Sequence, residues 1–377
     1  MRILFVGDTS NFYVSLASAL QTLGHECVII SDGCHWLNTF RNHDLSRQPG
    51  VWGGVKYVAK LLTLLPKMRG FDVVHLRCPI FLSLKPEKVR LVLNYLKRNN
   101  RLVVLTALGT DCFYYDTCHD GKTFRYSDYF VGDKPSPYRL SQTFQEHELG
   151  WEFPNVRRYH DYLLNNVDGV IACLYEYFVT YQKYAPAEKL FYSGTPICTS
   201  ELVPDFITET PEKVKFFIGM YKGRTVIKGT DLMLEALKRV HDRYPNESEI
   251  TVVESVPYEQ YKSLMRSSHV ALDQLYSYTP STNALIAMAQ GTVAVSGAEE
   301  EFYQFIGEKE CRPVINVSPL VPGDIDRQLE HLITHRHLLP QLSRQSREFV
   351  IKHNDATLVA RRHLEAWDAI SNLKNNR

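Results

Sequence analysis

Short apolar runs and amphipathic stretches alternate along the chain from its first residues. Ile3–Val6 is a continuous apolar run, the pattern of a buried parallel strand. The turn-rich segment Gly7–Asn11 follows, and apolar residues then recur at helical spacing up to Gly24, which predicts the end of a helix. A second apolar run, Cys27–Ile30, completes a strand–loop–helix–strand unit. This order predicts the start of a doubly wound α/β sheet.

The same alternation continues through the first half of the chain. Further strands are predicted at Asp72–Leu76, Leu102–Thr106 and Gly169–Ala172, and further helices at Glu87–Lys97 and Arg157–Asn165. A long aromatic-rich stretch, from about Phe113 to Trp151, shows little periodicity and is interpreted as a large loop or insertion. Its aromatic content favours an ordered segment, which we expect to hang over a cleft from the first domain.

A segment rich in Pro, Thr, Ser and Gly, Tyr192–Pro211, is interpreted as an interdomain linker. The α/β alternation then restarts. Strands are predicted at Val214–Ile218, Glu249–Val253, Val270–Leu272 and Val293–Val295, and helices at Asp231–Tyr244, Tyr258–Ser267, Ser281–Ala289 and through most of the tail from Asp324. We therefore predict two facing Rossmann-like domains, residues 1–195 and 212–355, with a cleft between the carboxyl ends of their sheets.

The composition excludes several classes of protein. The 377 residues carry a formal net charge of +1, with 44% hydrophobic and 23% charged residues, which is typical of a soluble globular protein and argues against a nucleic-acid-binding surface. No apolar run approaches the roughly 18 residues that span a bilayer, and the N-terminus lacks a signal-peptide pattern, so we expect a cytoplasmic protein. The eight cysteines form no Cys-x-x-Cys motif and are expected to be reduced thiols.

Charge is distributed unevenly. Residues 51–101 hold eleven Lys and Arg against only Asp72 and Glu87, a net charge of +9. Because apolar residues and tyrosines are interleaved with these cations, the block would suit peripheral contact with an anionic membrane. The alternative is a set of solvated helix faces.

Three segments could bind an anion. Gly7–Asn11 joins a strand to a helix N-terminus, whose free amides and dipole favour phosphate, although the Gly-x-Gly-x-x-Gly fingerprint is absent and a simple turn is the alternative. The second segment, Gly219–Asp231, places Lys222, Arg224 and Lys228 after a predicted strand. These cations suit a diphosphate clamp, and ordinary loop cations are the alternative.

The third segment is the start of the predicted helix Ser281–Ala289. Ser281 is a plausible N-cap, and Thr282 and Asn283 lie in the first turn. Its alanines let this helix pack close to the sheet, with its N-terminus directed at the same cleft. A well-capped buried helix without a ligand is the alternative.

The order and spacing of these segments match one known family. The chain resembles the retaining nucleotide-sugar glycosyltransferases of the GT-B fold, in particular glycosyltransferase family 4. Phe217–Gly219 followed by Arg224 and Lys228–Asp231 looks like the donor-diphosphate motif of that family. Ala287–Val295 looks like its Glu-Ala-Met-Ala-x-Gly-x-Pro-Val helix and strand.

The resemblance extends to the first half and the tail. Asp72–His75 and Leu108–Asp111 are similar to N-domain strand and His-Gly-Ser-Asp segments. By similarity, residues 1–195 form the acceptor domain, 212–355 form the donor domain, and a C-terminal helix at about 356–377, around Trp367, crosses back to the first domain.

The sequence departs from the family pattern at the donor site. Tyr278 and Ile286 stand where the family has two glutamates eight residues apart, and the second of these normally binds the donor ribose. Ser281 replaces the usual Gly, and Leu108 stands where a catalytic-site His is common. Asp273, Glu299 or Glu301 could supply the missing carboxylate.

The resemblance implies transfer of a sugar, of hexosyl type, from a nucleotide-diphosphate sugar to an acceptor hydroxyl on a glycan, a lipid-linked intermediate or a small molecule, as in polysaccharide biosynthesis. Retention of anomeric configuration is implied, with no metal and no cofactor besides the sugar nucleotide as co-substrate. Asp111 is the expected catalytic residue, and a structural Asp that caps a loop is the alternative. The residues expected to bind the donor are Gly7, Arg224, Lys228, Asp273, Ser281, Thr282, Asn283 and Glu299.

Other polar groups have simpler interpretations. Asp324 and Asp326 mimic an Asp-x-Asp metal motif, but they follow Pro-Gly and open a helix, which favours a capping role. His75 and His119 are expected to be packed or exposed histidines. Two other classes of function stay open: a non-catalytic GT-B-like protein that binds a sugar nucleotide, and a sugar-nucleotide epimerase. The nucleotide base, the sugar, the acceptor and the oligomeric state are not determined by the sequence.

Overall fold

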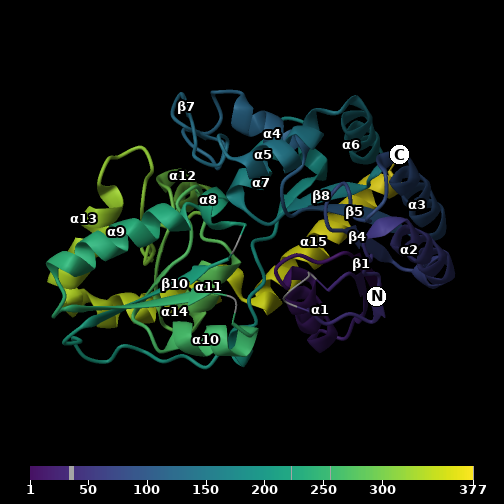
Figure 1. The fold of residues 1–377 in the computed structure, drawn as a ribbon. Coiled ribbons are helices and arrows are strands. Elements are labelled where there is room, and N and C mark those ends of the chain that lie inside the picture. The colour runs from purple at the N-terminus through teal and green to yellow at the C-terminus, as the bar shows by residue number, and fades with distance from the viewer. Residues whose placement is uncertain (34–37, 222, 255, 377) are drawn as a thin grey trace. The chain divides into compact units, whose positions relative to one another are not determined.

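The computed structural model describes residues 1–33, 38–221, 223–254 and 256–376. The chain divides into two compact units (Figure 1). Unit 1 comprises residues 1–115, 150–196 and 356–377, and unit 2 comprises residues 116–149 and 197–355. Residues 116–149 therefore cluster with the second unit, whereas the sequence analysis placed the aromatic stretch in the first domain.

Unit 1 is built on one parallel sheet with strand order β3-β2-β1-β4-β5-β8-β9 in the described residues. Its strands are β1 (Arg2–Val6), β2 (Glu26–Ser31), β3 (His43–Asp44), β4 (Val73–Leu76), β5 (Leu102–Ala107), β8 (Gly169–Ala172) and β9 (Leu190–Tyr192). Its helices are α1 (Phe12–Thr22), α2 (Gly50–Leu64), α3 (Pro86–Asn99), α6 (Pro154–Asn166), α7 (Tyr175–Tyr181) and α15 (Ala356–Asn375), and α4 (Cys112–His119) begins in this unit.

Alternating side chains of the apolar strands face two layers of helices, because successive residues of a strand point to opposite faces. Leu4 and Val6 of β1 belong to the core cluster formed with α2, α3 and α6. Phe5, between them, packs instead on Tyr13 of α1, with ring centroids 4.7 Å apart. This explains why the predicted strand is apolar at every position.

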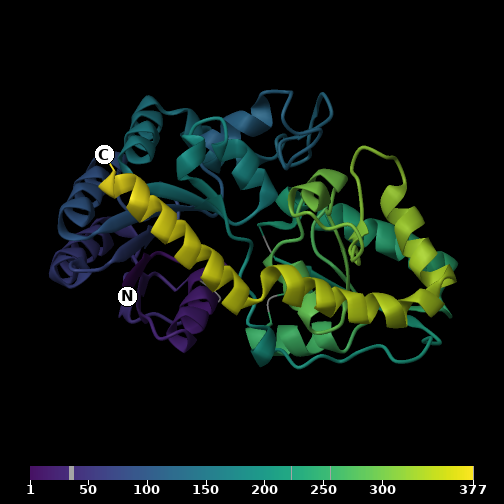
Figure 2. The ribbon, with the colours of Figure 1, turned by 180° about the vertical axis from the view of Figure 1, so that it is seen from behind.

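The C-terminal helix α15 lies across one face of the unit 1 sheet (Figure 2) and contacts α1 and β8, as the sequence analysis predicted for the tail. Close approach depends on Gly169, since a Cβ there would lie 2.4 Å from Cδ1 of Ile370. Trp367 Nε1 donates a hydrogen bond to His75 Nε2 at 2.8 Å, and both side chains are fully buried. The packed interpretation of His75 is therefore confirmed.

Unit 2 is built on a second parallel sheet, with strand order β11-β10-β12-β13-β14. Its strands are β10 (Val214–Met220), β11 (Ser248–Glu254), β12 (Val270–Leu272), β13 (Val293–Ser296) and β14 (Ile315–Asn316), with a separate hairpin of β6 (Phe130–Val131) and β7 (Lys134–Pro135). Its helices are α5 (Gln142–His147), α8 (Thr225–Lys228), α9 (Thr230–Arg243), α10 (Tyr258–Arg266), α11 (Thr282–Ala289), α12 (Glu300–Phe305), α13 (Asp324–Thr334) and α14 (Leu339–Asn354).

Strand β10 likewise has buried side chains on both faces of its sheet. Phe216 and Ile218 enter the larger core with α9, and Phe217 enters a smaller core with Met265 of α10 and Ala287 of α11. Because β10, β12 and β13 are parallel neighbours, their carboxyl ends and the loops that follow gather at one edge of the sheet.

Among the described residues, no helix combines the length and the apolar character needed to cross a membrane. The cysteines of the described ranges are free thiols, and Cys34 lies outside those ranges.

Candidate functional site

The loops after β10 and β12 meet in an ion pair. Lys228, at the end of α8, places Nζ 2.8 Å from Oδ1 of Asp273, which directly follows β12. The amide of Leu275 donates to the carbonyl of Lys228 at 2.8 Å, so the two loops are also joined through their backbones. Gly229 makes this possible, because its φ is +70° and a Cβ would lie 2.8 Å from Cβ of Leu275.

The carboxylate of Asp273 is the centre of a wider cluster. Its Oδ1 also accepts from Nδ2 of Asn283 at 3.3 Å, and its Oδ2 accepts from the amide of Ala284 at 3.3 Å and from Oγ of Ser281 at 3.5 Å. The Asp273 side chain is 1% exposed. A carboxylate in this position is favoured by the positive end of the α11 dipole.

Asp273 therefore caps α11 from another loop. Ser281 occupies the N-cap position as predicted, but its side chain makes no capping hydrogen bond within the helix. The sequence analysis missed this role because Asp273 and Ala284 are eleven residues apart, too far for a local capping pattern.

A tyrosine fixes the remaining polar group of the cluster. Tyr261 of α10 donates its hydroxyl hydrogen to Oδ1 of Asn283 at 3.0 Å. Burial first, and then the charge of Asp273, raises the pKa of Tyr261, so the hydroxyl stays protonated. Gly219 admits this ring to the end of β10, since a Cβ there would lie 2.2 Å from the Tyr261 hydroxyl.

The other predicted clamp residues border the same cluster. Arg224 immediately precedes α8 and is exposed, with its amide bonded to the carbonyl of Tyr221 at 2.9 Å. Thr282 is the half-buried first residue of α11. Lys222 lies outside the described residues. Lys228 is paired with Asp273 and is 29% exposed, and Arg224 is the more exposed of these two clamp cations.

Glu299 has a different set of partners. Its Oε2 accepts from Arg125 Nη2 at 2.7 Å, and its Oε1 accepts from the Tyr126 hydroxyl at 2.7 Å and from Nδ2 of Asn316 at 3.2 Å. Burial acts to raise the pKa of Glu299, but these three donors outweigh it and the pKa is lowered. Glu301 pairs with the same arginine at 2.9 Å. Glu299 therefore anchors residues 125–126, and Glu301 holds Arg125.

Tyr278 also anchors this segment. Its hydroxyl accepts from the amide of Arg125 at 2.7 Å, and its ring stacks on Tyr126 with centroids 4.8 Å apart. Ile286, at the other substituted glutamate position, packs against the small apolar core around Phe217. Tyr278 and Ile286, which stand where glycosyltransferase family 4 has glutamates, therefore make packing contacts in this protein.

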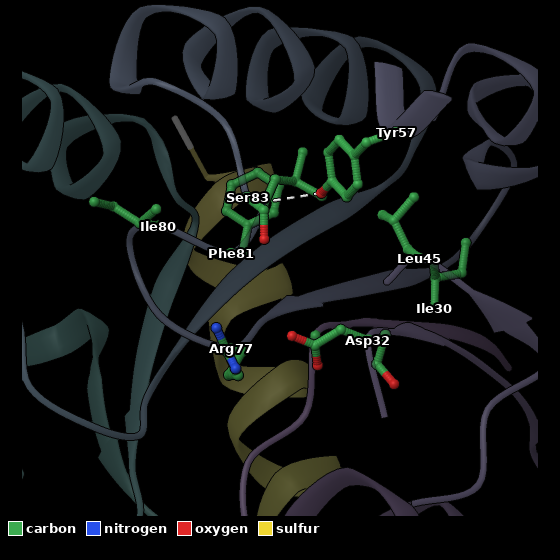
Figure 3. Close-up of a pocket in the computed structure, with 11 residues that line it drawn as sticks. Ile30, Asp32, Leu45, Tyr57, Arg77, Ile80, Phe81 and Ser83 are labelled. Carbon is green, nitrogen blue, oxygen red and sulfur yellow. Dashed lines mark hydrogen bonds between the residues drawn. The ribbon is translucent and has the colours of Figure 1, made fainter. Parts of the chain in front are cut away.

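Gly7 lies in unit 1, whereas the cluster lies in unit 2, and Gly7 lines a cavity of about 200 Å³. Its φ is +86°, and a Cβ would lie 3.0 Å from Cβ of Arg77. Figure 3 shows Arg77 and Asp32 on one side of the cavity and Tyr57 and Ser83 on the other. The Tyr57 hydroxyl accepts from the amide of Ser83 at 3.0 Å. The remaining lining residues are Ile30, Ser31, Leu45, Ile80, Phe81 and Leu82.

Asp111 is buried at the start of α4. Its Oδ1 accepts from the amide of Tyr114 at 2.9 Å, and its Oδ2 accepts from the Tyr181 hydroxyl at 2.5 Å. This is the geometry of the capping alternative. His119, also on α4, is half-buried against the ring of Tyr129, with centroids 5.0 Å apart.

The Asp-x-Asp sequence has structural partners. Asp324 accepts from the amide of Ser318 at 2.8 Å in the first turn of α13, and Asp326 makes a two-point ion pair with Arg239 at 2.9 and 2.7 Å. Within the described residues, no group of three or more His, Cys, Asp or Glu could hold a metal ion.

Comparison with solved structures establishes the fold. No family model matches the chain, and no curated protein matches its sequence. HepE from Anabaena, solved with UDP and glucose, matches 98% of this chain and 100% of its own at 12% identity and a TM-score of 0.58. Sucrose-phosphate synthase from Thermosynechococcus elongatus matches 100% of both chains at 13% identity and a TM-score of 0.63.

A third match is WaaG, a glycosyltransferase of lipopolysaccharide biosynthesis, with 98% of this chain and 99% of that chain aligned at 12% identity and a TM-score of 0.55. The chain therefore has the GT-B fold, with two Rossmann-like units, as the sequence predicted. At these identities the comparison concerns the fold.

Proposed function

We propose that this protein transfers a sugar from a nucleotide-diphosphate sugar to an acceptor hydroxyl. One observation carries the proposal: the cluster of Lys228, Asp273 and Asn283 stands at the carboxyl edge of the unit 2 sheet, beside exposed Arg224 and the N-terminus of α11. This edge is where open α/β sheets bind their ligands. Similar structures were solved with UDP and with UDP-glucose.

Each residue of the cluster has a proposed role. Arg224 and Lys228 bind the diphosphate and stabilise the negative charge that develops on it as the sugar leaves. The first turn of α11, Ser281–Asn283, presents backbone amides to the same group. Asp273 acts as a positioning residue. Its carboxylate pairs with Lys228 and accepts a hydrogen bond from Asn283, so it orients both side chains.

The finer assignment is also part of the proposal. We infer a retaining hexosyltransferase of glycosyltransferase family 4, without a metal, in which two side-chain cations and a helix N-terminus provide the positive charge at the leaving diphosphate. Retention proceeds by attack of the acceptor on the same face of the sugar from which the diphosphate departs. Glu299 supports the donor unit indirectly, through Arg125 and Tyr126.

Unit 1 is proposed to bind the acceptor. The cavity beside Gly7 combines Arg77 and Asp32 with apolar side chains, which suits a hydroxyl-rich group attached to an apolar one. Asp111 stays a proposed catalytic residue; its carboxylate accepts hydrogen bonds from the Tyr114 amide of α4 and from the Tyr181 hydroxyl. An Asp111→Asn variant that keeps full transfer would remove it from that role.

A second candidate is a non-catalytic protein that binds a sugar nucleotide. The observation that favours it is the use of Tyr278 and Ile286 for packing at the two glutamate positions of the resembling family. Arg224 and Lys228 argue for retained donor binding in either case.

Turnover distinguishes the candidates. UDP-, GDP- and ADP-sugars are incubated with the protein, and released nucleotide and sugar products are measured by mass spectrometry. Arg224→Ala with Lys228→Ala is the test variant, and Lys238→Ala with Arg239→Ala, on the exposed face of α9, is the matched control. Because no acceptor is added, water takes its place, and we expect slow release of nucleotide together with free sugar with wild type and control only. Binding without release would favour the non-catalytic candidate, and an isomerised sugar nucleotide would indicate an epimerase.

A further inference from the structure

Helix α2 exposes a large apolar face on unit 1. The exposed fractions are 83% for Val51, 78% for Trp52, 53% for Val55 and 60% for Leu62. The opposite face of the same helix is buried through Gly53, Tyr57, Leu61 and Leu64. Single exposed apolar residues are common on soluble proteins, whereas four on one helix, including a tryptophan, indicate an interaction surface.

The exposed residues form one stripe. At about 100° per residue, Val51, Val55 and Leu62 fall within roughly 40° of one another around the helix axis, and Trp52 lies at the edge of this group. Exposed Lys56 and Lys60 follow on the flank beyond Trp52. Lys60 also reaches Asp44 at 2.6 Å, so its charge is partly compensated.

The segment of the chain that contains the stripe is basic. Residues 51–101, which contain α2 and α3, carry the net charge of +9. Both helices pack on the same apolar core, through residues such as Leu61 and Leu93, and lie on one side of the sheet (Figure 1). Helix α3 adds exposed Lys88 and Arg90 beside Leu91, which is 69% exposed.

We propose that α2 docks unit 1 on an anionic lipid surface, with Val51, Trp52 and Val55 inserted among the headgroups. Charge complementarity selects this occupant, because a cationic helix with a tryptophan-bearing apolar stripe is the pattern of an interfacial helix on anionic lipid. A soluble acidic partner would match the charge but leave the apolar stripe unexplained.

The docking would bring the acceptor cavity to the membrane. Tyr57, on the buried face of α2, lines that cavity together with Leu45 and Phe81. A lipid-linked acceptor in the same membrane would then present its headgroup beside Arg77 and Asp32. This last step rests on the proposed function, whereas the docking itself does not.

Vesicle binding tests the proposal. The full chain is sedimented at low salt with phosphatidylcholine vesicles, with and without phosphatidylglycerol. The test variant carries Val51→Ser and Trp52→Ser, and the matched control carries Val203→Ser and Ile351→Ser, exposed apolar residues of unit 2. We expect the wild type and control to bind anionic vesicles only and to be released by high salt. The test variant should bind at least about tenfold more weakly.

A spectroscopic readout makes the test independent of folding defects. Of the tryptophans in the described ranges, Trp52 is exposed, Trp151 is half-buried and Trp367 is buried, so insertion of Trp52 should shift wild-type tryptophan emission to shorter wavelength and expose it to quenching by brominated lipid. Trp52→Phe should lose most of this response while keeping its melting temperature.

Several results would overturn the docking proposal. The first is that the wild type does not bind anionic vesicles at low salt, and the second is that the Val51/Trp52 variant binds them as strongly as the wild type. The third is that the protein binds no vesicles but forms a dimer in solution that Trp52→Ser disrupts. Nucleotide-induced stabilisation is measured on the same variant in solution. If the variant keeps its stabilisation by nucleotide but no longer binds vesicles, the docking surface has failed and the donor site has not.

Discussion

Lys228 Nζ and Asp273 Oδ1 lie 2.8 Å apart, and this pair joins the loops that follow two neighbouring parallel strands of unit 2. The lysine side chain is 29% exposed and the aspartate side chain 1% exposed. The cation is thus held at a defined place with one face open to a ligand. Asp273 fixes the position of Lys228, because its two carboxylate oxygens are themselves held by Asn283 and the first turn of α11.

Removing this carboxylate should destabilise unit 2. Asp273→Ala leaves Lys228, Asn283 and the Ala284 amide without their acceptor, so we expect the free energy of unfolding to fall by about 2–4 kcal/mol. Asp273→Asn keeps part of the hydrogen bonding and should cost less. Urea unfolding measures both. Asp326→Ala, which breaks an exposed pair with Arg239, is the control and should change it by no more than about 1 kcal/mol. Equal effects of Asp273→Ala and Asp326→Ala would refute the central role of Asp273.

Glu299 should contribute acid-sensitive stability. Its pKa lies below the ordinary 4.5: burial opposes ionisation, but Tyr126, Asn316 and Arg125 outweigh it. The carboxylate is ionised in the folded protein and takes up a proton more readily when unfolded, so its contribution is full above about pH 4.5 and is lost as pH falls through the folded pKa.

Glu299→Gln should accordingly reduce the free energy of unfolding by about 1 kcal/mol at neutral pH. The gap between the variant and the wild type should close below about pH 4.5. Urea unfolding at a series of pH values measures this gap. A gap that is constant across the series would show that ionisation of Glu299 plays no part.

Tyr278 should control the order of the segment around Arg125. Tyr278→Ala removes both the ring that stacks on Tyr126 and the acceptor of the Arg125 amide. We expect faster amide hydrogen exchange over residues 124–132, with a smaller increase in Tyr278→Phe, which keeps the ring. Tyr244→Ala is the control, because Tyr244 is the C-cap residue of α9 and its hydroxyl donates to Glu330 of α13. Unchanged exchange in Tyr278→Ala would mean that other contacts hold the segment.

The buried histidines of unit 1 should make it sensitive to mild acid. Burial lowers the pKa of His363 to about 4 and that of His75 well below its ordinary 6.5. Both rings are neutral when folded and take up a proton when unfolded below pH 6.5. Stability is therefore complete above pH 6.5 and is lost as pH falls toward the folded pKa, by about 1.4 kcal/mol per pH unit for each histidine.

His363→Asn tests this dependence. Asparagine can still donate to the Val359 carbonyl, which His363 contacts through Nδ1 at 2.9 Å. Between pH 7 and pH 5 the variant should lose about 1–2 kcal/mol less of its free energy of unfolding than the wild type. Exposed His335→Asn serves as the control. If both variants follow the wild-type profile, His363 is not the titrating group.

The parts of the fold that depend on local pattern were predictable. Strand β1 is apolar from Ile3 to Val6 and β10 is apolar from Phe216 to Ile218, because these residues are buried on both faces of their sheets, and α9 and α15 have regular helical periods. Helix α2 has no such signal, because Val51 and Leu62 are exposed while Tyr57 and Leu61 are buried, so apolar residues occur on both faces. The apolar residues of its exposed stripe do not pack in the core, so the core-facing pattern cannot predict them.

Several residues of the Lys228–Asp273 cluster were named from the sequence, but their connections were not predictable. Lys228 and Asp273 were both expected near the donor, yet their pairing joins residues 45 positions apart. Arg125 and Glu299 are 174 positions apart, and nothing in the aromatic stretch indicates that it packs in the second unit. Such contacts depend on how the strands are ordered in the sheet, which local periodicity does not encode.

Nucleotide binding at the clamp tests the central claim most directly. The melting temperatures of the wild type, Arg224→Ala/Lys228→Ala and the control Lys238→Ala/Arg239→Ala are measured with UDP, GDP, ADP and CMP. The account predicts that at least one nucleoside diphosphate raises the melting temperature of the wild type and the control and leaves the clamp variant unchanged, because a ligand stabilises only the state that binds it. An equal rise in the clamp variant, or no rise with any of these nucleotides, would contradict it.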